Sequence, residues 1–245
     1  MEPRSRTVFY AQCPTCRVFL GPFESADNAR QSILTHADRE HKEKLVQPIV
    51  RKVYFIDTHQ VRLTPIETQG LILDIGGGGE GTIGLLNGKK VVAIDPSLKE
   101  LEETENESLK IVMDARDLKF LPESFDVATS FFTMLFIDNS DHPKVFQEIH
   151  RILKPEGRFL ILDTDIPDDL THDMGFGIKL EISLPDRKVN TSYVRGKADD
   201  KGQSLLYFEQ LGAKTGFKNL KSCAEGSVFF IELIKLADSQ NRPAA

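Results

Sequence analysis

The sequence predicts an α/β protein in which helices cover a mostly parallel sheet, with a small separate unit at its N-terminus. Short apolar runs alternate with helix-like segments from residue 70 onward. Such runs, without polar alternation, suit a parallel sheet that is buried on both faces. A glycine-rich turn at 76–81 follows the first run directly. Residues 1–46 form the separate unit and hold Cys13, Cys16, His36 and His41.

Length and composition fit this organisation. A chain of 245 residues suits one α/β domain of about 190 residues and a small appendage. The net charge of −6 argues against bulk attraction to nucleic acid. The N-terminus has no apolar stretch typical of a signal peptide, and no run approaches the length of a membrane span. With only three cysteines, these features predict a reduced, cytoplasmic protein with no membrane association.

In the N-terminal unit, Cys13-Pro14-Thr15-Cys16 predicts a tight turn. Ser25-Ala26-Asp27 offers N-caps for a helix that runs to about Lys44 and carries both histidines. Residues 47–69 contain an extended run at 53–56 between two prolines. We interpret 47–69 as a linker that packs across the main domain.

The main domain is predicted to span 70–236, with elements in regular alternation. Pro143 is well placed in the first turn of a helix. Strands are predicted at 71–75, 90–94, 110–113, 126–131 and 158–163, and helices at about 81–87, 97–104 and 142–153.

The last part of the domain predicts a helix at about 204–215 and two strands near 219–224 and 227–236. The short turn Glu225-Gly226 between these strands predicts an antiparallel hairpin. The whole domain is therefore expected to be a seven-stranded sheet, mostly parallel, with the last strand antiparallel. The tail at 237–245 is predicted to be disordered.

Residues 166–203 interrupt the alternation. They are rich in proline, aspartate and glycine and contain a hairpin pattern, 178–184 with 188–194. The segment leaves the carboxyl end of the fifth strand, where open α/β sheets place their substrates. We expect it to form the wall of a substrate site.

The glycine turn predicts a ligand site, because glycine lets a ligand approach the backbone and the helix that follows offers free N–H groups. An adenosine-containing cofactor is the default interpretation. Asp74, two residues before the first glycine, would repel a pyrophosphate and attract an ammonium group. Asp114 can accept a hydrogen bond from an adenine amino group, and the Ala115 N–H can meet a ring nitrogen. Taken singly, such residues have structural explanations: Asp95 could cap the helix that starts at Pro96.

Together these segments resemble the class I S-adenosylmethionine-dependent methyltransferases over roughly 70–236. Residues 73–78, Leu-Asp-Ile-Gly-Gly-Gly, resemble the first motif of that family, and 91–95 resemble its second strand. Residues 114–118, followed by 122–127, are similar to the adenine-contacting segment and fourth strand. Residues 148–158 resemble the helix and turn found in small-molecule methyltransferases of the ubiquinone-biosynthesis type. The chain departs from the first motif at Glu80, which takes the place of a third glycine.

The resemblance implies a Rossmann-like fold and an S-adenosyl-L-methionine site in which Asp95 holds both ribose hydroxyls. It implies in-line methyl transfer, in which positioning and desolvation supply most of the catalysis, and we assign no catalytic residue. Asp163, Asp165 and His172, near the exit of the fifth strand, are candidates for a base. The implied cofactor-binding residues are Asp74, Gly76, Gly77, Gly78, Asp95, Asp114, Ala115 and Ser130.

The acceptor is expected to be a small molecule, because 130–133 lack the signature of amide and amine methylation on macromolecules. Two alternatives remain open. One is an RNA or protein methyltransferase recruited through the N-terminal unit, and the other is a non-catalytic protein that senses S-adenosylmethionine. An NAD-dependent oxidoreductase is disfavoured by Asp74 and by the terminal hairpin.

The four N-terminal ligand residues resemble a two-Cys two-His zinc finger over about 30 residues. Cys13-x2-Cys16 and His36-x4-His41 supply the ligand types of a structural zinc site. A unit of about 40 residues buries little core, so a bound Zn²⁺ would stabilise it. The alternatives are exposed helix histidines and a redox pair of cysteines.

Overall fold

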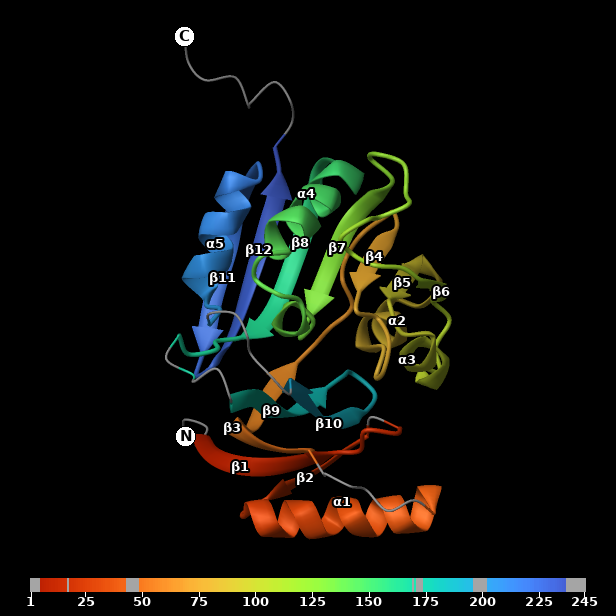
Figure 1. The fold of residues 1–245 in the computed structure, drawn as a ribbon. Helices are drawn as coiled ribbons and strands as arrows, with labels where there is room; N and C mark the ends of the chain where they lie inside the picture. The colour runs from red at the N-terminus through yellow and green to blue at the C-terminus, as the bar shows by residue number, and fades with distance from the viewer. Residues whose placement is uncertain are drawn as a thin grey trace. The chain divides into compact units, whose positions relative to one another are not determined.

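The computed structural model describes residues 5–16, 18–42, 49–168, 170, 174–195 and 202–236. The chain divides into two compact units, each of which is discontinuous in sequence (Figure 1). Unit 1 comprises 1–60, 168–181 and 190–201. Unit 2 comprises 61–167, 182–189 and 202–245.

Unit 2 contains a seven-stranded sheet in the order β11-β12-β8-β7-β4-β5-β6. The pairs β4–β5, β5–β6, β4–β7 and β7–β8 are parallel, whereas β12 is antiparallel to both β8 and β11. The predicted fold, a mostly parallel seven-stranded sheet with an antiparallel last strand, is confirmed. The strands are β4 (Ile72–Ile75), β5 (Val91–Asp95), β6 (Leu109–Val112), β7 (Phe125–Phe131), β8 (Leu153–Thr164), β11 (Phe217–Glu225) and β12 (Val228–Lys235).

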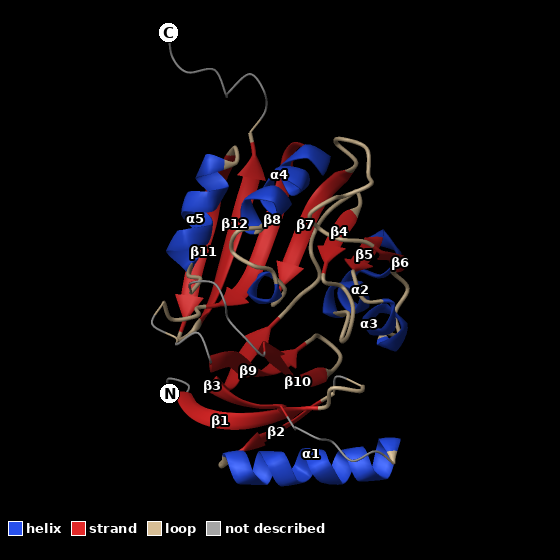
Figure 2. Cartoon of the chain, viewed as in Figure 1, coloured by secondary structure: helices blue, strands red, loops and turns tan. Residues whose placement is uncertain are grey.

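Helices pack on both faces of this sheet (Figure 2). On one face, Ile83 of α2 and Leu101 of α3 join a cluster with Ile72 and Val91. On the other face, α4 and α5 contribute to the largest core cluster, in which Phe146 and Phe208 stack with ring centroids 6.1 Å apart. The helices are α2 (Thr82–Asn87), α3 (Leu98–Glu103), α4 (His142–Ile152) and α5 (Leu205–Lys214), with short 3-10 turns η1 (Gly88–Lys90) and η2 (Met134–Phe136).

Unit 1 is a second sheet of five strands in the order β10-β9-β3-β1-β2, with one helix packed on β1 and β2. Ser25 caps that helix, as predicted, by accepting a hydrogen bond from the Asn28 N–H at 3.2 Å. The elements are β1 (Ser5–Gln12), β2 (Phe19–Phe23), α1 (Ala26–His41), β3 (Ile49–Arg62), β9 (Met174–Ser183) and β10 (Lys188–Arg195).

Unit 1 buries more apolar surface than its sequence suggested. Successive residues of β1 point to opposite faces of the sheet, and both faces are apolar. Val8 and Tyr10 pack with Val53 on one side, whereas Ala11 packs with Ile33 of α1 on the other. A metal ion is therefore not the only source of stability for this unit.

The domain boundaries differ from those expected. Residues 49–62 are strand β3, in which 49–56 pair with β1, and not a linker. Of the predicted linker, only 61–69 belong to unit 2. There, the Asn87 side chain makes two hydrogen bonds with the backbone of Ile66. The physical reason is the β-branched and aromatic pattern of 49–62, which favours a long strand once a partner edge is present.

The segment 166–203 also differs from expectation. Its hairpin pattern is confirmed as β9 and β10, but these strands extend the sheet of unit 1. The predicted tail at 237–245 and the end of the predicted N-terminal helix, near Lys44, lie outside the described residues. Among the helices that the structure describes, none is long and apolar enough to cross a membrane.

Candidate functional site

The glycine turn joins the carboxyl end of β4 to α2. The N–H groups of Gly76 and Gly77 both donate to the Ile94 carbonyl oxygen, at 2.8 and 3.0 Å, which fastens the turn to β5. Gly76 has φ +71°, a conformation that glycine adopts without strain. A Cβ on Gly76 would lie 2.2 Å from Thr133 Oγ1, so this position has no room for a side chain.

The second half of the glycine turn is held by α3 and by the segment that follows it. The Gly79 N–H donates to the Glu100 carbonyl at 2.8 Å. The Thr104 hydroxyl donates to the Gly79 carbonyl at 2.8 Å, and Asn106 Nδ2 donates to the Gly81 carbonyl at 3.0 Å. Gly79 and Gly81 therefore serve the fold of the turn, which explains how the chain accommodates its departure from the usual motif.

Close packing also requires the two central glycines. A Cβ on Gly77 would lie 2.7 Å from the Ala93 Cβ, and one on Gly78 would lie 2.6 Å from the Glu100 Cβ. Their backbone is thus pressed against β5 and α3.

Asp74 is almost fully buried, with 4% of its surface exposed. Its Oδ1 accepts a hydrogen bond from the Thr129 hydroxyl at 2.7 Å. Burial raises the pKa of Asp74 to about 7, the Thr129 hydrogen bond opposes this, and the negative charge of Asp95 raises the pKa further. A buried carboxyl of this kind is a favourable neighbour for a ligand ammonium group.

Asp95 ends β5 beside the glycine turn. Its carboxylate accepts the Ser97 N–H at 2.8 Å and the Gly78 N–H. Burial raises the pKa of Asp95, and these two hydrogen bonds oppose the shift. The contact with Ser97 shows that Asp95 caps the chain ahead of α3, and the contact with Gly78 places the same carboxylate against the glycine turn.

Asp114 follows β6 at the same edge of the sheet, because the Met113 N–H donates to the Asp95 carbonyl at 3.1 Å. Arg116 holds its carboxylate through its backbone N–H and its guanidinium. These hydrogen bonds lower the pKa of Asp114, although burial opposes them. Ala115, next to Asp114 in sequence, is buried in the largest core cluster.

Ser130 is placed differently from the other predicted residues. It pairs with Ile75 across β4 and β7, one position beyond the pair Asp74–Thr129. Side chains alternate along a strand, so Ser130 faces the opposite side of the sheet from Asp74. Its hydroxyl is buried without a hydrogen-bond partner among the described atoms.

The candidates for a base are not equivalent. Asp163 is fully buried, and its carboxylate accepts hydrogen bonds from Thr164 N, Gln203 Nε2 and Leu135 N at 2.8, 2.8 and 3.3 Å. Burial raises the pKa of Asp163 to about 7, against the opposing hydrogen bonds. This network ties three segments together. Asp165 accepts the Leu205 N–H at 3.3 Å, and His172 lies outside the described residues.

Sequence reasoning missed four residues that shape the site: Thr104, Asn106, Thr129 and Thr133. Their hydroxyl and amide groups bond to backbone or to Asp74 across 25 to 58 positions of sequence. No local pattern marks such residues. The position of Thr133, two residues after a predicted strand, was the one available signal.

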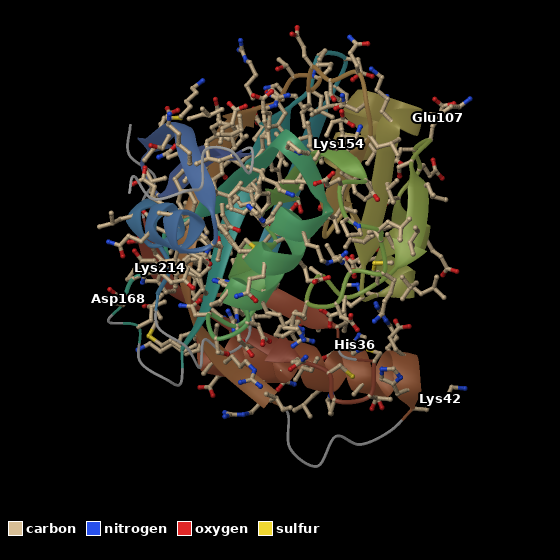
Figure 3. All side chains as sticks on the ribbon, turned by 90° about the horizontal axis from the view of Figure 1, so that it is seen from above. His36, Lys42, Glu107, Lys154, Asp168 and Lys214 are labelled. Atoms are coloured by element: carbon tan, nitrogen blue, oxygen red, sulfur yellow. The ribbon has the colours of Figure 1, made fainter. Side chains whose placement is uncertain are left out.

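A second cluster lies in unit 1, where Cys13, Cys16, His36 and His41 come together. Their donor atoms all lie within 4.8 Å of one another, and Cys16 Sγ is 3.3 Å from His36 Nε2. The His36 and His41 rings meet edge to face with centroids 5.2 Å apart. Figure 3 labels His36 on α1 and Lys42 just after the helix.

Two features of this cluster suit a cation. His41 Nε2 is buried and has no hydrogen-bond partner among the described atoms. Burial would raise the pKa of the Cys13 thiol, but hydrogen bonds from Cys16 and Thr15 outweigh it and lower the pKa. The cluster thus combines a thiol that ionises readily with an imidazole nitrogen that needs a partner.

Comparison with known proteins agrees with the geometry of unit 2. Residues 73–161 match the family model described as a methyltransferase domain. The sterol 4-C-methyltransferase strm-1 of Caenorhabditis elegans is 32% identical over 129 residues, which is 51% of this chain and 38% of that protein. The chain therefore spans well under half the length of this curated relative.

Solved structures show the same fold. An S-adenosylmethionine-dependent methyltransferase from Methanosarcina mazei superimposes with a TM-score of 0.51 at 16% identity, over 71% of this chain and 95% of that one. The PH0226 protein from Pyrococcus horikoshii gives a TM-score of 0.50 at 20% identity, over 69% and 84% of the two chains. Unit 2 has the α/β fold of these methyltransferases, and 73–161 match the methyltransferase-domain family model.

Proposed function

We propose that unit 2 binds S-adenosyl-L-methionine and transfers its methyl group to a small-molecule acceptor. One observation carries this proposal. Asp74, Asp95 and Asp114 lie at the carboxyl ends of three neighbouring strands, around a glycine turn that has no room for side chains. The donors and acceptors of the site match an ammonium, a ribose diol and an adenine.

Each acid has a distinct role in this proposal. Asp74 attracts the ammonium of the methionine moiety, Asp95 accepts from the ribose hydroxyls, and Asp114 accepts from the adenine amino group while the Ala115 N–H meets the ring. The backbone of Gly76, Gly77 and Gly78 lies along the ligand. Ser130 can contribute through its backbone only, since its hydroxyl faces the other side of the sheet. When bound, the cofactor supplies an electrophilic methyl group, so the protein needs chiefly to orient the acceptor and exclude water.

Calorimetry with S-adenosylhomocysteine and with NAD tests the cofactor. We expect the first to bind and the second not to. Asp95→Ala should weaken binding by about tenfold or more, since hydrogen bonds to a charged group contribute about 1.5–3 kcal/mol each. Glu103→Ala is the matched control, because Glu103 is an exposed acid on α3 paired with Lys99. Binding of NAD alone would overturn the proposal.

The acceptor is proposed to be largely apolar. The similarity to a sterol methyltransferase supports a small apolar acceptor. So do the exposed apolar side chains Phe136, in η2, and Leu206, in α5. Asn139 Nδ2 donates to the Gly202 carbonyl at 3.2 Å, which ties the segments that carry these two residues together.

Transfer of radiolabelled methyl groups identifies the acceptor class. Protein supplied with labelled S-adenosylmethionine and a cell extract should place label in the organic-solvent fraction. Label in RNA or protein would favour a macromolecular acceptor recruited by unit 1. Tight cofactor binding without transfer to any fraction would favour a non-catalytic sensor.

We further propose that Cys13, Cys16, His36 and His41 hold one structural Zn²⁺. Two thiolates and two imidazoles are the donors of a closed tetrahedral zinc site. Around such an ion, donor atoms lie about 3.3–3.8 Å apart, and small side-chain rotations would bring the observed cluster to that spacing. Four protein ligands leave no open position, so the ion would join the β1–β2 turn to the end of α1 and take no part in methyl transfer.

Elemental analysis of protein prepared without chelator tests the zinc site. We expect about one zinc per chain, with Zn–S bonds of about 2.3 Å by X-ray absorption. Cys16→Ser should lose the metal. Cys223→Ser is the control, because Cys223 is also an exposed free cysteine but lies on β11 in unit 2. Metal-free protein, or equal zinc in both variants, would contradict the site.

A further inference from the structure

Arg116 lies between two carboxylates that come from different parts of unit 2. Its Nη2 is 2.6 Å from Asp114 Oδ2, and its Nε lies 3.0 and 3.1 Å from the two Asp114 oxygens. Its Nη1 donates to Asp141 Oδ2 at 2.7 Å. Asp141 is the residue that precedes α4, so the guanidinium connects the turn after β6 to the start of that helix.

These contacts occupy most of the accepting capacity of Asp114. An ionised carboxylate has about four lone-pair sites. Oδ1 accepts from the Arg116 backbone N–H at 2.8 Å and from Nε. Oδ2 accepts from Nη2. Nε also lies 3.1 Å from Oδ2, but its single hydrogen is already counted on Oδ1. One site on Oδ2 remains, and the Asp114 side chain is 43% exposed, so a ligand donor can reach it.

The ion pair between Arg116 and Asp114 differs from an ordinary surface ion pair on the same turn. Lys119 and Asp117 are also separated by two residues, but they make one contact at 2.5 Å with side chains 69% and 63% exposed. Arg116 instead makes a two-pronged contact and is anchored at its far end by Asp141. A planar guanidinium held at both ends fixes the direction of its partner carboxylate.

We propose that Arg116 is a positioning residue that sets the purine specificity of the cofactor site. It keeps Asp114 in one orientation, with a single open acceptor aimed at the exocyclic group of the purine. This inference rests on the proposed function, in which Asp114 faces the adenine.

The chemistry of the purine makes the consequence specific. Adenine carries an amino group at C6 that donates to a carboxylate, whereas hypoxanthine carries a carbonyl oxygen there that a carboxylate repels. A fixed, ionised Asp114 therefore favours adenine. The hydrogen bonds from Arg116 also keep the pKa of Asp114 low. The charged groups around it are Asp117 on the same turn and Asp141 and Lys144 at the start of α4.

The test compares S-adenosylhomocysteine with S-inosylhomocysteine by calorimetry. Wild-type protein should prefer the adenine compound by about tenfold to a hundredfold, as expected for a hydrogen bond to a charged group. Arg116→Gln should reduce this preference to within a few-fold, mainly by weakening the adenine compound. Lys119→Gln, on the same turn, should retain the wild-type preference.

Asp141→Asn provides a second variant that leaves the Arg116–Asp114 contact in place. It should reduce the preference partly, because Arg116 Nη1 then donates to a neutral amide oxygen and loses its charged acceptor. Melting temperatures identify any variant that fails to fold. If Arg116→Gln and Asp141→Asn both keep the full preference while the wild type binds S-adenosylhomocysteine, the inference is overturned and the proposed function stands. If the wild type binds neither compound, the inference and the proposed function are both overturned.

Discussion

In the proposed site, Asp74 is the carboxyl whose charge state the ligand ammonium would change. Burial raises its pKa from 3.8 to about 7, so the carboxyl is about half protonated at neutral pH. A ligand ammonium nearby would favour the ionised form. In the proposed site, cofactor binding would therefore be coupled to loss of this proton.

We predict that S-adenosylhomocysteine releases about half a proton per site on binding at pH 7. The number follows from a pKa of about 7 that falls when the ammonium arrives, and the release should vanish at pH 8.5, where the carboxyl is already ionised. Calorimetry in phosphate and in Tris, which differ in ionisation enthalpy, measures it. Asp74→Asn should abolish the difference between the buffers. A wild-type enthalpy that is the same in both buffers at pH 7 would show that the ammonium does not lie near Asp74.

The raised pKa of Asp74 also affects the stability of the fold. The folded-state pKa values of Asp74 and Asp163 are both raised from 3.8 to about 7, so the native state binds more protons than the unfolded state between these values. The contribution of these two groups to the free energy of unfolding therefore decreases as pH rises from about 4 to 7 and is constant above.

We predict that the free energy of unfolding of unit 2 decreases by at least about 1 kcal/mol between pH 5 and pH 8. Urea denaturation at the two pH values measures it. Asp74→Asn should be less sensitive to pH than the wild type, because one of the two groups is removed. An increase in stability over this range would contradict the assignment.

The site residues that could be predicted are those marked by their immediate sequence neighbours. Asp74, Asp95 and Asp114 each follow an apolar run directly, so the strand pattern alone placed them at one edge. The contact between Arg116 and Asp141 spans 25 residues and depends on where α4 begins relative to β6. The opposite direction of the Ser130 side chain required the strand register, which the sequence did not define.

At the level of elements, the glycine turn depends on the segment between α3 and β6. Gly81 begins α2 with φ +53°, and a Cβ there would lie 2.0 Å from Thr104 Cγ2. Gly88 ends the same helix with φ +55°, but a Cβ there would meet only Glu107 Oε2, at 3.4 Å. Both glycines have positive φ, but Gly81 has ψ 40°, in the left-handed helical region, whereas Gly88 has ψ −129°, outside that region. They also differ in the space around them.

We predict that Gly81→Ala and Gly88→Ala both destabilise the protein, and that only Gly81→Ala weakens S-adenosylhomocysteine binding. Gly81→Ala should cost about 1–2 kcal/mol for the left-handed backbone and about 1–3 kcal/mol more because it overpacks against Thr104. Gly88→Ala should cost about 1–3 kcal/mol through its backbone conformation alone. Thermal melts and calorimetry of both variants measure the two effects; an equal loss of binding in both variants would show that the packing against Thr104 is unimportant.

The strands of the parallel sheet were predicted because each is a short apolar run between turn signals. The strands of unit 1 were harder to recognise. Val8, Phe9, Tyr10 and Ala11 are consecutive apolar residues with no alternation, since α1 covers one face and Val53 and Phe55 pack on the other. The pairing of β3 with β9 joins residues more than a hundred positions apart, and no local pattern specifies it.

For the molecule as a whole, each unit has its own hydrophobic core. The proposed zinc ion joins only the β1–β2 turn to α1. The sheet of unit 1 also includes β3, β9 and β10, so the expected effect of metal loss is local.

We predict that chelation increases hydrogen exchange in α1 and around Cys13 and Cys16, and leaves unit 2 unchanged. Hydrogen exchange resolved by mass spectrometry measures this before and after chelator. Cys16→Ser should reproduce the effect, and Cys223→Ser should not. Increased exchange throughout unit 2 after chelation would show that the two cores are not independent.

The discontinuity of unit 1 matters while the chain is being made. Strand β3 is complete at residue 62, but its neighbour β9 begins at residue 174. A ribosome adds about 5–20 residues per second, so one edge of β3 waits several seconds for its partner. An unpaired edge strand invites pairing with other chains. Nascent chains stalled before β9 should therefore depend on chaperones, even though the finished protein closes that edge itself.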